Sequence, residues 1–589
     1  MTDKAAAAPA DRLSTWESIK LYGERRVFVM LLLGFSAGMP NLLIFDTLSA
    51  WLRESGQTLE VIGFFALATL TYALKFVWAP LVDRTSIPFL TNIFGHRRSW
   101  MLVTQAIVIL GLWLIAGSNP ASSLGAMAAF AVLVGFFGAT QDIVIDAWRI
   151  EAAEDTRQGA MAAAYQWGYR VAMIVAGAAP LVLAEMYNWN MSYAVMACLM
   201  GFGVLGVLMA PREKQHTIRP IPVGDVPSRP ALEWAEWLVR LALIAFMALV
   251  IGVGMTAKPD ILGWFVAGIG GSPEAFAATV TDKETGVYWQ LSLVAVGLVG
   301  LVLSCWPIPG VKTRPGAYLA GSFGQPLKDF FARFGKLALL ILALICFYRL
   351  ADFVLNIMNP FYLDLGFTKT ELAEVRKVFG VIASVVGVAL GGFSVARLGL
   401  IRTMVIGAFA SPVSNLVFAW LATQGHDLFA LFVAIGVDNS ASGFAGTALI
   451  AYMSSLTSIG FTATQYALFS SLYALPGKLI AAQSGRIVEG SARAAEAGGL
   501  FGPLKGLFAN MPPDVLAKGA ETSGVTPAAL GAGYIVFFLY STLIGVFAIV
   551  LAFIVAARQE AIRAKGTAGV APTAVDTPEG EPEQVKPKN

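Results

Sequence analysis

Residues 78–100 read WAPLVDRTSIPFLTNIFGHRRSW and join two long apolar segments. Asp83 is followed at once by Arg84, and Arg97 and Arg98 come just before the next apolar run. Opposite charges at the ends of neighbouring membrane helices can pair and hold the helices together. We therefore predict that these four residues belong to a gate at the cytoplasmic surface. The alternative is that the arginines only anchor the loop on that side of a membrane.

The composition around this loop is that of a membrane protein. The chain is 57% hydrophobic and only 13% charged, and its mean hydropathy is +0.68. Soluble domains have about 25% charged residues. Cys198, Cys305 and Cys346 all lie in apolar runs, so the sequence predicts no disulfide framework. We expect no cleaved signal peptide, because the first apolar run is long enough to span a bilayer.

Runs of roughly 20 apolar residues mark helices that cross a membrane. Working outward from residues 78–100, we find fourteen such runs. They are 27–50, 59–81, 99–117, 122–148, 158–184, 190–210, 237–256, 287–307, 335–363, 371–396, 401–423, 427–453, 461–482 and 531–557.

The positions of the basic residues give the orientation. With the N-terminus in the cytoplasm, 27 of the 41 Lys and Arg residues fall in cytoplasmic segments, nine in periplasmic segments and five inside spans. Cytoplasmic loops of membrane proteins carry an excess of Lys and Arg. Both termini are therefore predicted to be cytoplasmic, in a chain that crosses a bacterial inner membrane many times.

An even number of spans with a basic segment in the middle suggests two similar halves. We predict an all-α membrane protein with two six-helix bundles and two extra helices between them. The predicted parts are a cytoplasmic tail (1–26), a first bundle (27–211), a linker with the two extra helices (212–334), a second bundle (335–560) and a disordered cytoplasmic tail (561–589). The second bundle contains a long periplasmic loop at 483–530, in which GLFGPLKGLFANMPPDV is either a surface helix or a flexible tether.

The loop at 78–100 resembles the cytoplasmic loop signature of the major facilitator superfamily, although an insertion lengthens it. The second half contains an incomplete copy of this signature, GGFSVARLGLIR at 391–402, in which Ala396 occupies the position of the acidic residue. In a facilitator bundle the third helix of each triplet faces lipid. The third and sixth predicted spans hold no charge, and the eleventh holds none apart from Arg402 at its cytoplasmic end, which fits that arrangement.

Charged side chains inside spans cost roughly 2.5–3.5 kcal/mol on insertion scales and therefore mark functional positions. They include Asp46, Lys75, Asp142, Asp146, Arg170, Arg349, Asp352, Asp438 and Lys478. No histidine lies in a span, so any proton coupling must use a carboxylate. We predict that Asp46, Asp142, Asp352 and Asp438 are the candidates. Arg349 and Asp352 are three residues apart and can pair on one helix face, which also allows a purely structural role.

The stretch ATQDIVIDAW, residues 139–148, places Asp142 and Asp146 on one helix face. Asp146 falls near the cytoplasmic surface, close to Arg149. We expect both to belong to the gate, with Asp146 pairing toward Arg84 or Arg97. Asp142 lies one turn deeper, either as a substrate or proton site or as a structural partner of Lys75 or Arg170.

Several runs are similar to the AmpG-type muropeptide permeases. They are GFSAGMPNLLIFDTLSAWLRESG, IGFFALATLTYALKFVWAPLVDR, GHRRSWMLVTQ, GATQDIVIDAWRIE, GYRVAMIVAGAAPL and FTATQYALFSSLYALPGK. The resemblance implies an importer of N-acetylglucosaminyl-1,6-anhydro-N-acetylmuramyl peptides, driven by the proton gradient. It implies a place in cell-wall recycling and a link to β-lactamase induction.

On that reading Lys75, Arg170, Arg349 and Lys478 serve carboxylates of the substrate. Gln141, Asn356, Asn439 and Gln465 serve sugar hydroxyls and acetamido groups, with Asp142 and Trp167 beside them. An aromatic ring such as Trp167 also suits the interfacial belt of a membrane protein.

Other functions stay open. One is import of a different anionic metabolite, such as acetyl-CoA, another acyl-CoA or a siderophore. A membrane enzyme is disfavoured because no His–Asp pair stands out at a membrane surface, and a sensor without flux does not need two matching halves. We expect no metal, no cofactor other than the proton gradient and no nucleic-acid partner, in a monomer whose partners are substrate, protons and lipid.

Overall fold

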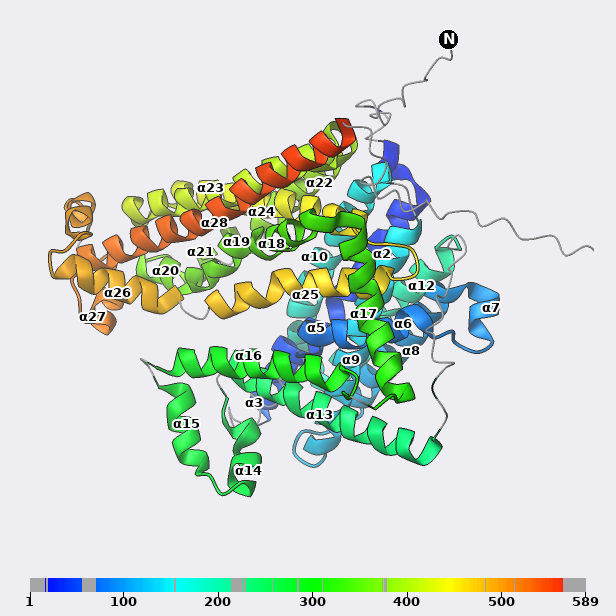
Figure 1. Cartoon of the computed structure of the whole chain (residues 1–589). Helices are drawn as coiled ribbons and strands as arrows, with labels where there is room; N and C mark the ends of the chain where they lie inside the picture. The colour runs from blue at the N-terminus through cyan, green and yellow to red at the C-terminus, as the bar shows by residue number, and fades with distance from the viewer. Residues whose placement is uncertain are drawn as a thin grey trace, which may run out of the picture.

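The computed structural model describes residues 16–564 except 17–19, 56–69, 153–154, 213–225, 227–228, 257, 283–284, 310, 373, 376–378, 482–483 and 513. The described residues contain helices and no strand. Figure 1 shows long helices gathered into two groups, with further helices beside them. The all-helical expectation is confirmed for this part of the chain.

The first group comes from the N-terminal third of the chain. It consists of α2 (Arg25–Leu42), the π-helical η2 (Leu43–Thr47), α3 (Leu48–Glu54), α5 (Leu70–Leu74), the 3-10 helix η4 (Lys75–Val77), α6 (Ala79–Arg84), α7 (Leu90–Phe94), α8 (His96–Ala116), α9 (Leu124–Ala152), α10 (Asp155–Met186), α11 (Trp189–Leu199) and α12 (Gly201–Met209). The first predicted span is interrupted after Pro40. Proline lacks the N–H that a regular helix needs, and π-helical turns are common at such points.

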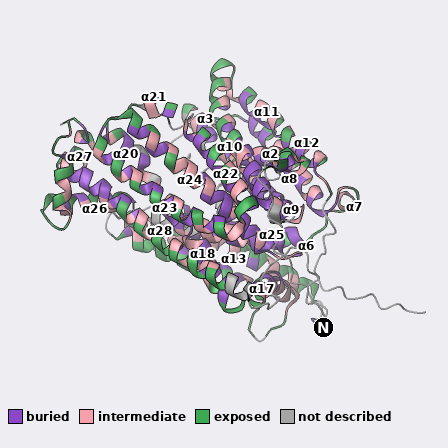
Figure 2. Ribbon diagram, turned by 90° about the horizontal axis from the view of Figure 1, so that it is seen from above, coloured by how far each residue is buried: buried purple, intermediate pink, exposed green. Residues whose placement is uncertain are grey.

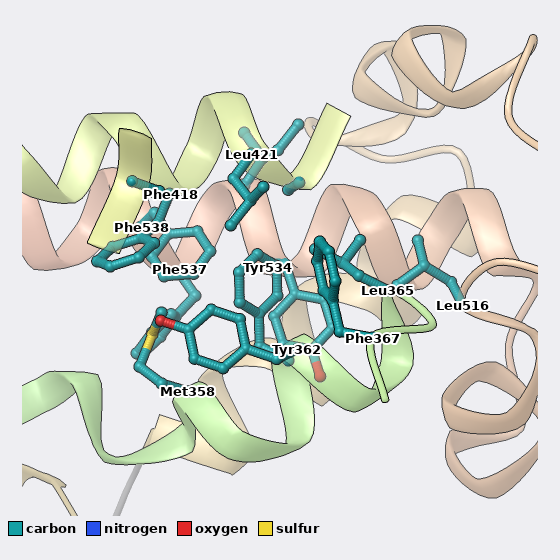
Figure 3. Close-up of a cluster of buried hydrophobic side chains, with 14 of the residues drawn as sticks. Met358, Tyr362, Leu365, Phe367, Phe418, Leu421, Leu516, Tyr534, Phe537 and Phe538 are labelled. Carbon is teal, nitrogen blue, oxygen red and sulfur yellow. The ribbon is translucent and has the colours of Figure 1, made fainter. Parts of the chain in front are cut away.

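The second group comes from the C-terminal part. It consists of α18 (Ala338–Phe347), α19 (Leu350–Val354), η6 (Leu355–Ile357), α20 (Met358–Asp364), α21 (Lys369–Leu372), α22 (Gly380–Leu398), α23 (Leu400–Gln424), α24 (Leu428–Ser455), α25 (Thr462–Ala481) and α28 (Pro527–Ala564). Its core includes Met358 and Tyr362 of α20, Phe418 of α23, and Phe537 and Phe538 of α28, whose side chains face one another in Figure 3.

Two further long helices, α13 (Pro230–Thr256) and α16 (Gly286–Cys305), lie side by side. Gly254 and Gly297 let their backbones approach closely, since a Cβ on Gly254 would lie 2.6 Å from the carbonyl oxygen of Gln290. Close approach through small residues is a usual way to pack helices in membranes. The pair packs against the first group through a cluster that includes Leu74, Ile251 and Leu301.

Three segments differ from the expectation of plain loops. The segment after α13 contains α14 (Asp260–Gly268) and α15 (Pro273–Thr281), which project from the molecule in Figure 1. A 21-residue helix, α17 (Arg314–Phe334), followed by η5 (Gly335–Leu337), occupies the end of the linker. The long loop contains three elements: α26 (Ser484–Glu496), the 3-10 helix η8 (Gly502–Phe508) and α27 (Ala517–Ser523). It is therefore neither a single surface helix nor a tether without structure.

The long loop is fixed to the second group of helices. The N–H of Leu516, in this loop, donates to the carbonyl of Asp364 in α20 at 2.7 Å. Oδ2 of the same Asp364 accepts from the hydroxyl of Tyr534 in α28 at 2.6 Å. Hydrogen bonds from the side chain and N–H of Thr526 lower the pKa of Glu496. The two inserted loops also meet, because Nη2 of Arg486 donates to the carbonyl of Asp282 at 3.3 Å.

Eleven helices in the described part of the chain are long and apolar enough to cross a membrane. They match eleven of the fourteen predicted spans, although the ninth, 335–363, only overlaps a longer stretch, Arg314–Asp352, that also includes α17. The predicted spans 27–50 and 461–482 are not among the eleven, and neither is 59–81, part of which lies outside the described residues. Many exposed residues have large apolar side chains, as lipid contact requires. Figure 2 shows exposed positions (green) along the helices.

Candidate functional site

A buried group of charges joins the two groups of helices at one end. Nη2 of Arg97 lies 2.7 Å from Oδ1 of Asp83 and 2.7 Å from Oε1 of Glu151. The Asp83 carboxylate accepts hydrogen bonds from the N–H of Ala463 at 3.1 Å and of Thr464 at 2.8 Å, and from the Thr464 hydroxyl at 2.7 Å. We call Asp83, Arg97, Glu151 and Thr464 the latch, and this end of the molecule the latch end.

The latch links α6 in the first group to α25 in the second. The free N–H groups at the first turn of a helix carry partial positive charge and attract a carboxylate. Asp83 therefore binds the N-terminus of α25 while Arg97 balances its charge. The side chains of Arg97 and Asp83 are fully buried, so water does not screen this contact.

The two other arginines of the loop at 78–100 face elsewhere. Nη2 of Arg84 donates to the carbonyl of Gly321 at 3.2 Å and to Oε1 of Gln325 at 3.0 Å, both in α17. Nε of Arg98 donates to the carbonyl of Val207 at 3.1 Å, in α12 of its own group. Of the four predicted gate residues in that loop, the latch contains Asp83 and Arg97.

Asp146 does not pair with Arg84 or Arg97, which corrects that expectation. Its Oδ1 lies 3.3 Å from Nη2 of Arg149, one helical turn away on α9. Arg149 instead crosses to the second group. Its Nη1 donates to the hydroxyl of Ser454 at 2.9 Å, and its guanidinium lies over the ring of Tyr466 at 5.3 Å. Asp146 pairs with Arg149 because a residue three positions along the same helix lies closer to it than the arginines of the loop.

A cavity of about 290 Å³ lies within the second group of helices. Its lining combines four charged or amide side chains with a hydroxyl and apolar groups: Arg349, Asp352, Leu355, Met358, Tyr362, Ile435, Asp438, Asn439 and Ser442. Its size and its few convergent polar groups are those of a binding site for a small molecule.

The cavity's arginine is braced from two helices. Nε of Arg349 lies 2.6 Å from Oδ2 of Asp352, and its Nη2 donates to the hydroxyl of Ser442 at 2.7 Å. A Cβ on Gly446 would lie 2.8 Å from Nη1 of Arg349 and 3.3 Å from Oε1 of Gln166. The absence of a side chain at Gly446 therefore leaves room for the side chains of both Arg349 and Gln166 of α10.

Serines of α23 hold the two cavity carboxylates. The hydroxyl of Ser411 donates to Asp352, and that of Ser414 donates to Oδ1 of Asp438 at 3.3 Å. α23 corresponds to the eleventh predicted span, which carries no charge beyond Arg402 in its first turn but does present these hydroxyls to the two carboxylates. The carboxylates are thus connected by one helix through polar side chains.

The first group contributes a second set of charges. Nζ of Lys75 lies 3.9 Å from Oδ2 of Asp142, whereas Oδ1 of Asp142 is buried without a hydrogen-bond partner among the described residues. Arg170 makes no hydrogen bond or ion pair within the described chain, and its charge interacts with that of Arg349 across the two groups. A cation inside a predicted span that pairs with no described residue is the strongest sign of a site for an anion in this half.

Three predicted binding residues are already engaged by the protein. Gln141 donates to the hydroxyl of Ser36 at 2.6 Å. Trp167 donates its indole N–H to the carbonyl of Val385 at 3.0 Å, which bridges the two groups. Gln465 donates to Asp329 at 3.0 Å and is buried beside α17, away from the cavity.

Asn439 lines the cavity and donates to the carbonyl of Ile435 at 3.0 Å. The side chains of Asp46, Asn356 and Lys478 lie outside the described residues.

Sequence reasoning missed several polar residues. Glu151, Ser411, Ser414, Ser442 and Thr464 all contact predicted site residues. A small polar residue in an apolar run is inexpensive to insert, so it gives a much weaker signal than a charge. A search for serines one turn apart in otherwise apolar spans would have found Ser411 and Ser414.

Comparison with known proteins agrees with this architecture. Residues 30–278 match the Major Facilitator Superfamily model. The chain is 30% identical to "Putative transporter AmpG 4" of Rickettsia conorii, over 80% of this chain and 91% of that one. It is 29% identical to "Anhydromuropeptide permease" of Escherichia coli K12, over 80% of this chain and 76% of that one.

Among solved structures, the proton:xylose symporter XylE aligns with 89% of this chain and 95% of its own, at a TM-score of 0.48 and 10% identity. That likeness is too low to say anything about the substrate. The relative from Rickettsia conorii is covered almost completely, and the predicted resemblance is confirmed. The chain belongs to the AmpG family of transporters, within the major facilitator superfamily.

Proposed function

We propose that this transporter imports anhydro-muropeptides, N-acetylglucosaminyl-1,6-anhydro-N-acetylmuramyl peptides, from the periplasm to the cytoplasm. The observation that carries the substrate is the similarity over 474 residues to a relative named anhydromuropeptide permease. Import across the bacterial inner membrane serves cell-wall recycling and, through the cytoplasmic muropeptides, β-lactamase induction.

The polar groups in the middle of the molecule suit such a ligand. Muropeptides carry carboxylates, and Arg170 forms no ion pair with any residue that the structure describes, while Arg349 lines the cavity. Asn439 and Ser442 can hydrogen-bond sugar hydroxyls and acetamido groups. A charged substrate in a low-dielectric site gains most from a cation that has no other partner.

The proposal includes proton coupling through Asp352, Asp438 or Asp142. Asp352 is paired with Arg349, so a proton on Asp352 would release the guanidinium for a substrate carboxylate. Loss of that proton on the cytoplasmic side would restore the pair and expel the substrate. Asp142 beside Lys75 offers the same exchange in the first half.

The proposed topology has fourteen spans with both termini in the cytoplasm. Contacts between loops support the alternation of sides. Asp329 and Ser458 lie in loops predicted to be cytoplasmic, and their side chains are 2.8 Å apart. Arg486 and Asp282 lie in loops predicted to be periplasmic, and they are also in contact. On this topology the latch closes the cytoplasmic side, so it must open to release substrate.

The deciding experiment is uptake of radiolabelled GlcNAc-anhydroMurNAc, with and without peptide, into proteoliposomes under an imposed pH gradient. We expect uptake that collapses when a protonophore is added. If folded protein takes up none of these compounds, the substrate assignment is wrong. Competition by acyl-CoA or a siderophore would then identify another anionic solute.

Arg170→Ala tests the site. Because Arg170 has no ion pair among the described residues, its removal leaves no buried charge uncompensated, and the protein should fold and reach the membrane normally. We expect uptake to fall at least about a hundredfold, as loss of a charged hydrogen bond of about 3 kcal/mol implies. Unchanged uptake by Arg170→Ala would remove this residue from the site.

A further inference from the structure

Helix α17 lies across the latch end, where the sequence predicts only a loop. Its buried residues recur along one face: Pro315, Gly316, Leu319, Ser322, Pro326, Phe330 and Phe334. Figure 1 shows α17 (green) beside both α6 and the beginning of α25, the two helices that the latch joins, and both contacts are present in the structure. A helix in this place spans the opening through which substrate would leave.

The first part of α17, before Pro326, is attached to the first group of helices. Arg84, at the end of α6, donates to the carbonyl of Gly321 and to the side chain of Gln325. The ring of Tyr318 contacts Trp237 of α13 at 6.1 Å, and α13 itself packs against the first group.

The second part of α17, after Pro326, is attached to the second group. Oδ2 of Asp329 accepts from the hydroxyl of Ser458 at 2.8 Å, and Nη2 of Arg333 donates to the carbonyl of Leu456 at 2.8 Å. The ring of Phe330 packs on that of Phe469 in α25 at 5.3 Å. None of these residues belongs to the first group.

Pro326 lies between the two sets of contacts. As a proline inside a helix it has no N–H to donate to the carbonyl one turn earlier, so the helix is weakest at this point. The carbonyl of Pro326 accepts from the side-chain amide of Gln465 at 2.9 Å, in the first turn of α25. The helix can therefore bend where the two groups of helices must separate.

We propose that α17 is a jointed strap across the cytoplasmic opening. Its first part moves with α6 and its second part moves with α25, and Pro326 is the joint. When the latch opens, the strap bends rather than detaching from either group. It keeps α25 in register with α6, so that Asp83 meets the same N–H groups each time the latch closes. The inference goes beyond the proposed substrate, since it concerns the motion and not the cargo.

Reversible crosslinks test the two attachments. In a chain with Cys198, Cys305 and Cys346 replaced by Ser, three cysteine pairs are introduced separately and joined by a short thiol crosslinker that reductant removes. One pair, Arg84→Cys with Gln325→Cys, ties the strap to α6. Another, Asp329→Cys with Ser458→Cys, ties it to the second group. The third, Asp83→Cys with Thr464→Cys, ties the latch shut.

Each variant is its own control, since uptake is compared before and after reduction. We expect the first two crosslinks to change uptake less than twofold and the latch crosslink to reduce it at least tenfold. If either strap crosslink blocks uptake as strongly as the latch crosslink does, the strap must detach during transport and the proposal is wrong. Failure of either strap pair to crosslink would remove the contacts on which the proposal rests.

A second readout does not depend on the substrate. Thr464 is buried, so a lone cysteine placed there by Thr464→Cys reacts with maleimide only when the latch opens. Pro326→Ala restores the missing hydrogen bond and stiffens the joint, and we expect it to slow this labelling at least threefold. The matched control is Pro315→Ala, in the first turn of the same helix, where no N–H is needed and labelling should stay within twofold. Equal labelling rates for both proline variants would refute the joint.

Discussion

Two junctions between the halves occupy matching positions and are built from different chemistry. At the first, α6 meets the beginning of α25 through the buried charges of the latch. At the second, α22 meets α10, and the position that would carry the acid is the buried Ala396. There Gly159 faces Gly392 so closely that a Cβ on Gly159 would lie 2.8 Å from the Gly392 carbonyl oxygen.

The second junction extends along both helices. Trp167 donates to the Val385 carbonyl at 3.0 Å, and the hydroxyl of Tyr22 donates to the carbonyl of Ala389 at 3.1 Å. The close packing of Gly159 against Gly392 depends on the shape of the two helices, and its energy decays steeply with separation. A charged contact with a helix N-terminus acts over a longer range and is removed by neutralising one carboxylate. The first junction is therefore suited to opening and closing, and the second to holding the halves in register.

The largest expected effect comes from removing the cation of the first junction. Arg97→Ala removes the buried cation that lies 2.7 Å from both Asp83 and Glu151, and we expect a loss of about 3–5 kcal/mol in the free energy of unfolding. Thermal unfolding in detergent measures it. Arg493→Ala is the control, since its ion pair is exposed and contributes about 1 kcal/mol at most. A shift no larger than the control's would mean that the latch is not stabilising.

A smaller effect is expected when the second junction is overfilled. Gly159→Ala places a methyl group against the backbone of Gly392 and should destabilise the fold by about 1–3 kcal/mol. Gly125→Ala is the matched control, because its Cβ would meet nothing within 4 Å and alanine favours a helix by up to about 1 kcal/mol. The difference between the two unfolding temperatures isolates the packing at this junction. If both variants gain stability, the helices are not in close contact.

The smallest effect concerns a single hydrogen bond. Trp167→Phe keeps a ring stacked on Tyr22 but removes the N–H that reaches Val385, and we expect a loss of about 0.5–1.5 kcal/mol. Trp189→Phe also loses an indole hydrogen bond, to the exposed side chain of Glu54, and should change stability less. Equal losses of stability in the two variants would show that the hydrogen bond between Trp167 and Val385 stabilises the fold no more than the exposed one between Trp189 and Glu54.

Much of the architecture could be predicted, because hydropathy and charge dominate the insertion of a membrane chain. The pairing of Asp83 with Arg97 could be anticipated from opposite charges on adjoining helices. Its actual partner on α25 could not, since nothing in the spacing of Asp83 and Thr464 along the chain indicates contact. The predicted pairing of Asp146 with Arg84 or Arg97 is wrong because opposite charge in the loop is a weaker guide than proximity. Arg149 is only three residues away on the same helix.

Helix α17 shows why other parts of the structure are hard to predict from the sequence. A proline in its middle and three glycines in its first half argue against a helix in an isolated sequence. Contacts with α6, α13 and α25 supply the stability that its own residues lack. The cavity shows the same limit, because Ser411 and Ser442 gain importance only from the charges that packing brings to them.

The meeting of Arg486 with Asp282 has a consequence for anyone who wishes to shorten this chain. The inserted segments 257–286 and 483–530 are far apart in sequence, yet the side chain of Arg486 reaches the carbonyl of Asp282. The segment 483–530 also supplies buried residues to the core of the second group, among them Val488, Phe508 and Leu516. Deleting it would uncover that core, so a shortened carrier must keep this segment, whereas 257–286 is the better place to trim.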